Sequence, residues 1–391
     1  MSRSIQRELN DLYTKLGGAD FTIAAVTKGA FTQARSKLLP SAFKELIDLS
    51  VRDFYQGAPY LVWKDCRLLA VDGSILNLPR HASITARFGE YGMGADKQTV
   101  RGMARVSLCY DVLNLMTLNA QVESYRVSEH HLLQKHLKET AFKKNDILLL
   151  DRGYRSNALM SELLLQGLHF CIRVDASWKA IKALKASNEW DGITTLQVDE
   201  EAFAELKHRY PEAPHTFKVR FVRIQLENNM EQYLATSLYD RQQYSLEDLK
   251  DLYQRRWQIE EAYKMFKTQT QWERFSGKTA RAVEQDVFAK VFMMNCCALF
   301  AHPIETRVRQ ETATAQQAGT RQHKAKINRR ILLGFLKENW TKLWKQRKTG
   351  RMLKALADLL NSTIEIVRPG RKFKRRKLRI HPPGDTTYKQ P

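Results

Sequence analysis

The amino-acid sequence predicts an α/β protein whose core is interrupted by an insertion and flanked by helical regions. Two short apolar runs end in aspartates, Asp72 and Asp151, as is typical of strands that present an acid at their carboxyl ends. The stretch 252–267 carries apolar residues at helical intervals. An alternating segment, 217–226, is followed by a turn and a second apolar run at 233–238, which predicts a β-hairpin between the two halves of the core.

The strongly basic composition predicts an anionic partner. The formal net charge is +22, and residues 301–391 alone hold 23 Lys and Arg against six Asp and Glu. Nucleic acid is the commonest partner for such an excess. The longest apolar stretch, 291–301, is too short to span a bilayer, and the N-terminus lacks the apolar segment of a signal peptide. We therefore expect a cytoplasmic protein with no membrane partner.

Changes in pattern along the 391 residues indicate several segments rather than one uniform domain. Helical periodicity dominates at the start, strand-like runs follow, and basic amphipathic stretches and a cationic tail (368–379) close the sequence. The expected segments are a helical N-terminal domain (1–62), the first half of a core (63–173), a β-rich insertion (174–235), the second half of the core (236–302) and a basic helical C-terminal region (303–391).

Within the core, the pattern predicts strands that alternate with helices. The two strands that end in acids lie about 80 residues apart, with room for a hairpin and a helix between them. Besides these strands, the expected elements are a hairpin (103–110 and 115–122), helices (128–138, 157–166 and 283–301) and a strand (169–174).

The stretch 252–267, taken as one continuous helix, has a polar face of mixed chemistry. At about 100° per residue, four of its residues fall within a sector roughly 60° wide. These residues are Tyr253, Arg256, Glu260 and Lys267, with Lys264 at the edge of the sector. An acid beside cations and a phenol suits a polyanion held near a metal ion. The alternative is an ordinary solvated helix face.

The spacing of these four residues is Tyr253-x2-Arg256-x3-Glu260-x6-Lys267. It resembles the Y-R-E-K signature of the insertion-sequence-four family of DDE transposases. Asp72-Gly-Ser and Asp151-Arg-Gly-Tyr resemble the first and second acidic motifs of the family, in the expected order. Either aspartate alone would also fit an ordinary strand-to-turn junction. The resemblance covers most of residues 31–300 and implies a ribonuclease-H-like catalytic core interrupted by a β-rich insertion.

The resemblance implies a cut-and-paste DNA transposase of a bacterial insertion sequence. Such an enzyme cleaves DNA by phosphodiester hydrolysis, often through a hairpin intermediate, and joins strands by transesterification. The implied catalytic residues and metal ligands are Asp72, Asp151 and Glu260, which would hold two divalent cations, Mg²⁺ or Mn²⁺. Oxygen ligands suit these ions. His130 and His131 are better interpreted as surface or capping residues, and five cysteines without paired spacing do not predict a zinc site.

The implied partner is double-stranded DNA, as the terminal inverted repeats of the element and as target DNA. Tyr253, Arg256 and Lys267 would bind phosphates at the element end, with Lys264 beside them. Trp178 is a candidate for stacking on an extruded base, and Trp190 is the alternative, although an aromatic residue is more often part of a core. The family also implies a homodimer in the synaptic complex and a nucleoid-associated location.

Two other classes of function stay open from the sequence. One is a metal-dependent nuclease or recombinase on the same fold that never joins strands. The other is a non-catalytic DNA-binding protein derived from a transposase. The presence of all three acids and of the signature favours an active enzyme over the second of these.

Overall fold

A computed structural model of the chain describes residues 4–17, 25–93, 99–227, 229–345 and 349–367. The predicted cationic tail, 368–379, lies outside the described residues. The chain folds into two compact units. The first unit comprises Met1–Gly57, Leu76–Ala104 and Met265–Pro391, and the second comprises Ala58–Ile75 and Arg105–Lys264. Because these units follow packing rather than chain order, the five segments expected from the sequence stay a prediction.

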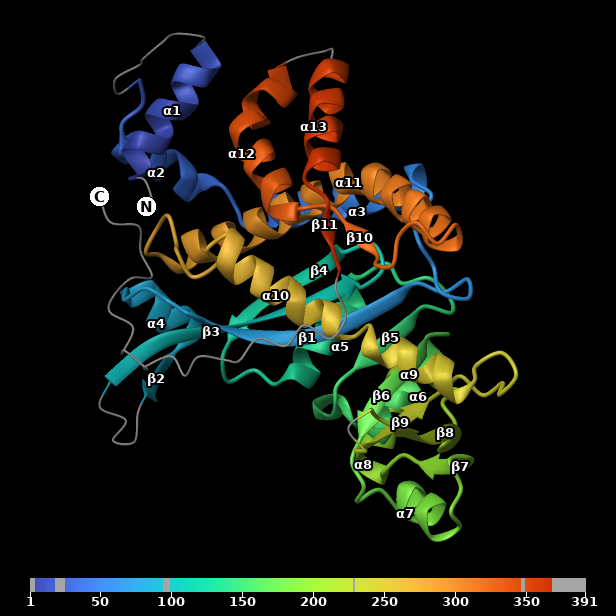
Figure 1. Cartoon of the computed structure of the whole chain (residues 1–391). Coiled ribbons are helices and arrows are strands. Elements are labelled where there is room, and N and C mark those ends of the chain that lie inside the picture. The colour runs from blue at the N-terminus through green and yellow to red at the C-terminus, as the bar shows by residue number, and fades with distance from the viewer. Residues whose placement is uncertain (1–3, 18–24, 94–98, 228, 346–348, 368–391) are drawn as a thin grey trace. The chain divides into compact units, whose positions relative to one another are not determined.

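The beginning of the chain is helical (Figure 1). The three helices are α1 (Ile5–Gly17), α2 (Lys28–Lys37) and α3 (Ser41–Gly57). Thr27 caps α2, because its hydroxyl accepts a hydrogen bond from the amide of Ala30. Arg35, near the end of α2, donates from Nη2 to Asp286 Oδ1 over 2.8 Å, an ion pair within the first unit.

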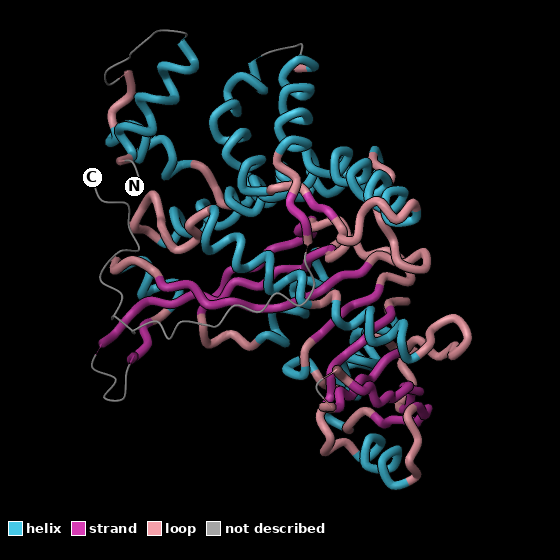
Figure 2. The backbone as a smooth tube through the Cα atoms, viewed as in Figure 1, coloured by secondary structure: helices cyan, strands magenta, loops and turns pink. Residues whose placement is uncertain are grey.

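One large mixed sheet contains most of the strands, which are magenta in Figure 2. Its order is β2-β3-β1-β5-β6-β9-β8-β7, and β4 pairs with β3. β1, β5 and β6 run parallel to one another, whereas β6, β9, β8 and β7 pair antiparallel. The strands are β1 (Leu68–Asn77), β2 (Glu90–Met93), β3 (Thr99–Asp111), β4 (Met116–Ser124), β5 (Ile147–Leu150), β6 (His169–Val174), β7 (Asp191–Gln197), β8 (Thr216–Gln225) and β9 (Glu231–Thr236).

The parallel strands form the centre of the second unit. All four residues of β5 are completely buried, as expected for a parallel strand covered on both faces. A buried ion pair joins the starts of β1 and β5, where Arg67 Nε donates to Asp146 Oδ1 over 2.8 Å. The pair fixes the alignment of the two strands at the end opposite to the aspartates.

β1 does not end at Asp72, as the sequence predicted, but continues to Asn77. Its pairing with β5 covers only residues 68–70, and β1 also has β3 as a neighbour. The strand therefore continues in the sheet after β5 has ended. Asp72 lies at the point where β1 leaves β5, not at the carboxyl end of the strand.

The segment predicted to be a β-rich insertion has its three strands, but it also contains two helices, α7 and α8. Its strands extend the core sheet, because β9 pairs with β6. Buried Arg220 binds both carboxylate oxygens of Asp191 and donates to the carbonyls of Leu238 and Tyr244, each over 2.8 Å. The helices of this unit before residue 245 are α5 (Glu129–Glu139), α6 (Asn157–Leu165), α7 (Lys179–Ala186) and α8 (Glu200–Arg209).

The single helix predicted over 252–267 is wrong. The chain forms two helices there, α9 (Leu246–Gln254) and α10 (Trp257–Gln269), both drawn in yellow in Figure 1. At the junction the hydrogen bonds span three residues: the amide of Arg256 donates to Tyr253 O over 3.1 Å. Such bonds tighten the chain like a 3₁₀ turn and change the direction of its side chains. The polar face calculated for one straight helix therefore does not continue across the junction.

Helices also form most of the C-terminal region (Figure 2). The elements of the first unit outside the large sheet and the N-terminal helices are α4 (Ala82–Phe88), α11 (Ala280–Gln317), α12 (Arg329–Lys345), α13 (Gly350–Ser362), β10 (Ala325–Lys326) and β11 (Glu365–Ile366). α11 is long and apolar enough to cross a membrane, but 61% of its most apolar window is buried. This burial is typical of a core helix, so α11 is weak evidence for a membrane span.

Candidate active site

Asp72 and Asp151 come together because β1 and β5 are adjacent and parallel. The register pairs Ala70 with Leu149, and two further residues along each strand bring Asp72 level with Asp151. Each carboxylate is oriented by the backbone that follows it. Asp72 Oδ1 accepts from the amide of Gly73 over 2.8 Å, and Asp151 Oδ1 accepts from the amide of Arg152 over 2.7 Å.

Arg256 joins the third acid to the first. Its Nη2 donates to Glu260 Oε1 over 2.7 Å, and its Nη1 lies 3.9 Å from Asp72 Oδ2. Arg256 is buried, with 5% of its surface exposed, and its Nε has no hydrogen-bond partner among the residues that the structure describes. The guanidinium group thus supplies positive charge between two carboxylates, and Asp72, Glu260 and Arg256 form one cluster.

Two tyrosines bind α9 and α10 to the strands that carry the aspartates. The hydroxyl of Tyr263 on α10 donates to the carbonyl of Asp72 over 2.7 Å. The hydroxyl of Tyr253 on α9 donates to the carbonyl of Leu150, the residue before Asp151, over 3.3 Å. Both tyrosines are buried. Their hydrogen bonds attach the two helices to the strands and so fix the position of Glu260 relative to the two aspartates.

Tyr263 was not identified from the sequence. It stands three residues after Glu260, so helical spacing places it near the face of the acid. That spacing was the available signal, but an aromatic residue at such a position is more often an ordinary core residue. Its hydrogen bond to a strand that precedes it by 191 residues cannot be read from local pattern.

The environment of Asp72 favours binding of a cation. The pKa of Asp72 is raised to about 6, chiefly by burial and also by the carboxylates of Glu129 and Glu260, while the Gly73 amide and the Arg256 guanidinium lower it. A carboxylate whose negative charge is poorly compensated gains most from a bound cation. Carboxylate oxygens are also the ligands that Mg²⁺ and Mn²⁺ prefer. The chemistry of these residues therefore fits divalent cations.

The side chains are not gathered into a finished metal site. Among the described residues, no group of three or more His, Cys, Asp or Glu side chains is close enough to hold a metal ion. The Arg256 guanidinium lies between Glu260 and Asp72 instead. All five cysteines are buried with free thiols, and burial raises the pKa of each.

The remaining predicted residues lie outside this cluster of contacts. Lys264 is exposed and pairs with Glu261 on its own helix. Lys267 is exposed on α10, seven residues beyond Glu260. The ring of Trp178, at the start of α7, lies 5.6 Å from that of Phe221.

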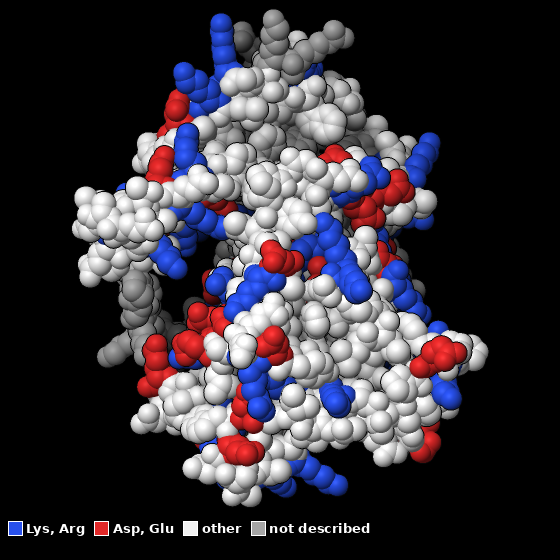
Figure 3. Space-filling model, turned by 90° about the vertical axis from the view of Figure 1, so that its right-hand side faces the viewer, with Lys and Arg blue, Asp and Glu red and all other residues white. Residues whose placement is uncertain are grey.

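Trp190, the alternative aromatic residue, is 38% exposed, and the Arg223 guanidinium lies 4.6 Å from its ring centroid. Its face is thus already used by a cation–π contact. On the surface drawn in Figure 3, Lys and Arg side chains are interspersed with Asp and Glu, without one continuous basic area. That face by itself does not indicate a path for DNA.

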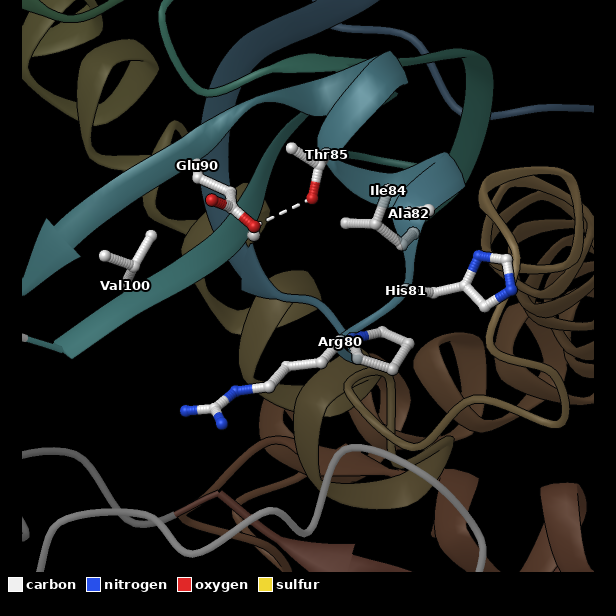
Figure 4. Close-up of a pocket in the computed structure, with 9 residues that line it drawn as sticks. Arg80, His81, Ala82, Ile84, Thr85, Glu90 and Val100 are labelled. Carbon is white, nitrogen blue, oxygen red and sulfur yellow. Dashed lines mark hydrogen bonds between the residues drawn. The ribbon is translucent and has the colours of Figure 1, made fainter.

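A separate pocket of about 520 Å³ lies in the first unit. Figure 4 shows that Arg80 and His81 point away from the hydrogen bond between Thr85 and Glu90, which is 2.8 Å long. The rest of the wall is mostly apolar, with Ile84 and Val100 among its residues. The one acid of the wall, Glu90, is already hydrogen-bonded to Thr85, and the Arg80 side chain points away from this pair. The polar groups of the pocket therefore do not converge on one point.

Comparison with known proteins identifies the family. The model of the family described as "Transposase DDE domain" matches residues 63–296, which is more than half of the chain. The matched region contains β1, β5 and α10, the three elements that carry the acids. Members of this family act as nucleases and transesterases and generally use divalent metal ions.

One relative is the transposase InsG for insertion sequence element IS4 of Escherichia coli, 23% identical over 276 residues. The match covers 69% of this chain, which spans 60% of the length of that relative. A cryo-electron microscopy structure of the piggyBac transposase synaptic complex with hairpin DNA is 12% identical, with a TM-score of 0.43. The alignment covers 80% of this chain and 60% of the piggyBac chain. At this TM-score the similarity supports no structural conclusion. From the match over residues 63–296, the chain belongs to the transposase DDE domain family.

Proposed function

We propose that this chain is the DNA transposase of a bacterial insertion sequence, of the IS4-like type, with a ribonuclease-H-like core. It binds terminal inverted repeats and catalyses cleavage and strand transfer by a cut-and-paste route, through a hairpin. The observation that carries the proposal is the Arg256 bridge between Asp72 and Glu260, beside Asp151, within the region that matches the family. These acids come from segments far apart in the chain, which is common for the residues of an active site.

Asp72, Asp151 and Glu260 are the proposed catalytic residues and metal ligands. Two divalent ions held by them, Mg²⁺ or Mn²⁺, would activate the attacking oxygen and stabilise the leaving oxygen. Tyr263 keeps the backbone of Asp72 against α10, so that Asp72 and Glu260 stay within reach of one guanidinium. The proposal assigns Arg256 two tasks: it balances the acids in the free protein, and it binds a phosphate when DNA is present.

The Y-R-E-K signature describes the proposed DNA contacts. Arg256 and Lys267 would bind phosphates near the scissile bond, with Lys264 at the edge and Trp178 as the stacking residue. Tyr253 is buried, and its hydroxyl already donates to Leu150, so its contribution would be to support the turn that presents Arg256. The chemistry of these side chains supports phosphate binding, because guanidinium and ammonium groups form charge-assisted bonds with anionic oxygens.

The proposed partners are the inverted repeats of the element, target DNA and a second copy of the chain in the synaptic complex. The net charge of +22 supports a polyanionic partner. The proposed location is the bacterial cytoplasm, in association with the nucleoid.

A reaction with the purified protein tests the proposal. The full chain is incubated with Mg²⁺, a DNA fragment that carries the inverted repeats flanking its gene, and a target plasmid. We expect cleavage at the element ends and joining of those ends to the plasmid. Cleavage without joined products would indicate a nuclease, and end binding without cleavage would indicate a non-catalytic DNA-binding protein. Either result would contradict the proposal.

The cationic tail provides a separate prediction about DNA binding. A chain that ends at residue 367 lacks the basic residues of 368–391, so it should release fewer counterions when it binds DNA. The slope of log K against log salt, measured by fluorescence anisotropy, should become shallower. A full-length control with the tail Lys and Arg replaced by Gln should show the same reduction. An unchanged slope in both variants would mean that the tail does not contact DNA.

A further inference from the structure

Glu129 is a carboxylate that lies beside Gly73, the residue of β1 after Asp72, and beside Gly153, in the turn that follows Asp151. It is the first residue of α5, after the cap Ser128. Its Oε1 would lie 3.1 Å from a Cβ atom placed on Gly73, which follows Asp72. Its Oε2 would lie 3.5 Å from a Cβ atom on Gly153, in the turn after Asp151. The two oxygens of one side chain thus lie beside the strand residue after Asp72 and the turn after Asp151, and the missing side chain of Gly73 leaves space for the carboxylate.

α5 is held in this place by a contact with the turn after Asp151 and, through Ser107 of β3, by a link to Asp72. The ring Nε2 of His130 is 2.9 Å from the carbonyl oxygen of Gly153. Further along α5, the ring Nε2 of buried His136 is 2.9 Å from Ser107 Oγ. Ser107 Oγ in turn donates to the carbonyl of Asp72 over 3.2 Å. The position of Glu129 is therefore fixed relative to both aspartates by the fold and not by a flexible loop.

An ordinary role does not account well for Glu129. An acid in the first turn of a helix usually stabilises the helix dipole, and it does so from solvent. The carboxylate oxygens of Glu129 instead lie beside Gly73 and Gly153, next to the aspartates. Among the described residues its ion-pair partner is Arg105, whose Nη1 is 3.9 Å from Oε1. An ion pair of that length contributes little. Asp72 and Asp151 also repel the Glu129 carboxylate, because its oxygens lie beside Gly73 and Gly153.

A second observation points to a missing ligand at the same place. The hydroxyl of Tyr154, directly after Gly153, is completely buried and has no hydrogen-bond partner within the described part of the chain. The carboxylates of Glu129 and Asp72 lie close enough to this hydroxyl to act on it electrostatically. A buried donor without a partner costs free energy unless something it can bind arrives. A hydrated cation among the acids would provide an oxygen for it to bind.

We propose that Glu129 is a fourth carboxylate of the candidate active site, which holds a divalent cation together with Asp72 and Asp151. The proposal rests on the proposed function, because it concerns the same site and the same cations. It adds a ligand from α5, an element that carries none of the three acids of the family motifs.

Titration of the full chain with Mn²⁺, without DNA, tests this assignment. Calorimetry or the loss of the free Mn²⁺ electron paramagnetic resonance signal gives the Kd. Glu129→Gln keeps the size of the side chain and removes its charge, and it should raise the Kd at least tenfold. Glu129→Asp, which keeps the charge but shortens the side chain, should give an intermediate Kd. Glu247→Gln removes an exposed acid from α9 and should leave the Kd unchanged.

Arg105→Gln separates a ligand from a structural ion pair. If Glu129 binds the cation, loss of Arg105 removes a competing positive charge and should leave the Kd equal or lower. If Glu129 serves only to hold Arg105, Arg105→Gln and Glu129→Gln should lower the melting temperature alike, with no change in Kd. That result would overturn the assignment. Should Glu129→Gln fail to fold, the Kd of Glu129→Asp decides in its place, and a wild-type value contradicts the proposal.

Asp72→Asn distinguishes failure of this inference from failure of the proposed function. A tenfold or greater loss of Mn²⁺ binding in Asp72→Asn, with a wild-type Kd in Glu129→Gln, would remove Glu129 from the site and leave the three acids in place. Absence of Mn²⁺ binding in the wild-type protein would contradict both proposals. Matched losses in Asp72→Asn and Glu129→Gln would support both.

Discussion

Replacing Asp72, Asp151 or Glu260 with alanine, one at a time, is expected to reduce cleavage of element-end DNA by at least about 10³-fold. Each change removes an oxygen ligand from the proposed metal pair, whose stabilisation of transition-state charge is worth several kcal/mol. DNA binding should change only a few-fold, because cations elsewhere in the chain bind the phosphates. Cleavage is measured on a gel with Mg²⁺, and binding by anisotropy in Ca²⁺.

Glu247→Ala is the matched control for these three variants, because Glu247 is an exposed acid on α9, in the same unit as the site. It should cleave DNA at the wild-type rate. Mg²⁺-dependent cleavage that persists in any one of the three alanine variants would remove that residue from the proposed site. Loss of folding, seen as a lower melting temperature without Mg²⁺, would indicate a structural role instead.

Arg256→Ala is expected to slow cleavage or hairpin formation by about ten- to a hundred-fold. The variant loses a charge-assisted phosphate contact, on the order of 1.5–3 kcal/mol. It should still bind Mn²⁺ at least as tightly as the wild type. The guanidinium contacts Glu260 at 2.7 Å and so competes with a cation for that carboxylate. A slower reaction combined with equal or tighter metal binding separates Arg256 from the three acids.

Two substitutions test whether charge explains the effect of Arg256. Arg256→Lys keeps the charge but loses the planar group, and it should retain more activity than Arg256→Ala. Lys267→Ala should also slow cleavage while metal binding is retained, and Lys267→Arg should restore part of the rate. Wild-type rates in Arg256→Ala would mean that the contact with Glu260 is only structural, and that the spacing of the four signature residues is coincidental.

The strands of the core could be predicted because their burial is visible in the sequence. The run Ile147–Leu150 is continuous and apolar, and the structure forms β5 from those four residues. The strand at 169–174 also has the predicted bounds. The predicted helix at 283–301 is correct in type but too short, since α11 spans Ala280–Gln317. Its later turns are more polar, so apolar periodicity underestimates the length.

The junction between α9 and α10 could not be predicted by the same reasoning. Periodicity assumes a constant rotation per residue, whereas the chain tightens at Arg255 and Arg256 through bonds that span three residues. The buried contacts of Arg256 with Glu260 and Asp72 accompany this change of direction. No Pro or Gly marks the junction in the sequence.

Residues that reach the candidate site from other elements were also invisible to local pattern. Glu129 follows a capping serine, so its sequence context is that of an ordinary acid in the first turn of a helix. Glu129 comes close to Gly73 and Gly153 only through the packing of α5 in the folded chain. The three acids are predicted from the sequence because their motifs resemble those of a family, and not because their proximity is encoded locally; their role as a site stays a prediction.

The imbalance of charge in the cluster has a consequence for the order in which a transposition complex can assemble. Four carboxylates face two guanidinium groups there, those of Asp72, Asp151, Glu260, Glu129, Arg105 and Arg256. An excess of negative charge repels a phosphodiester, and the repulsion is strong in a partly buried place. Basic residues in other parts of the chain could bind an element end while the scissile bond stays away from these carboxylates. In the proposed transposase, cutting would therefore wait until bound cations have neutralised these carboxylates, and a half-assembled complex would leave the chromosome uncut.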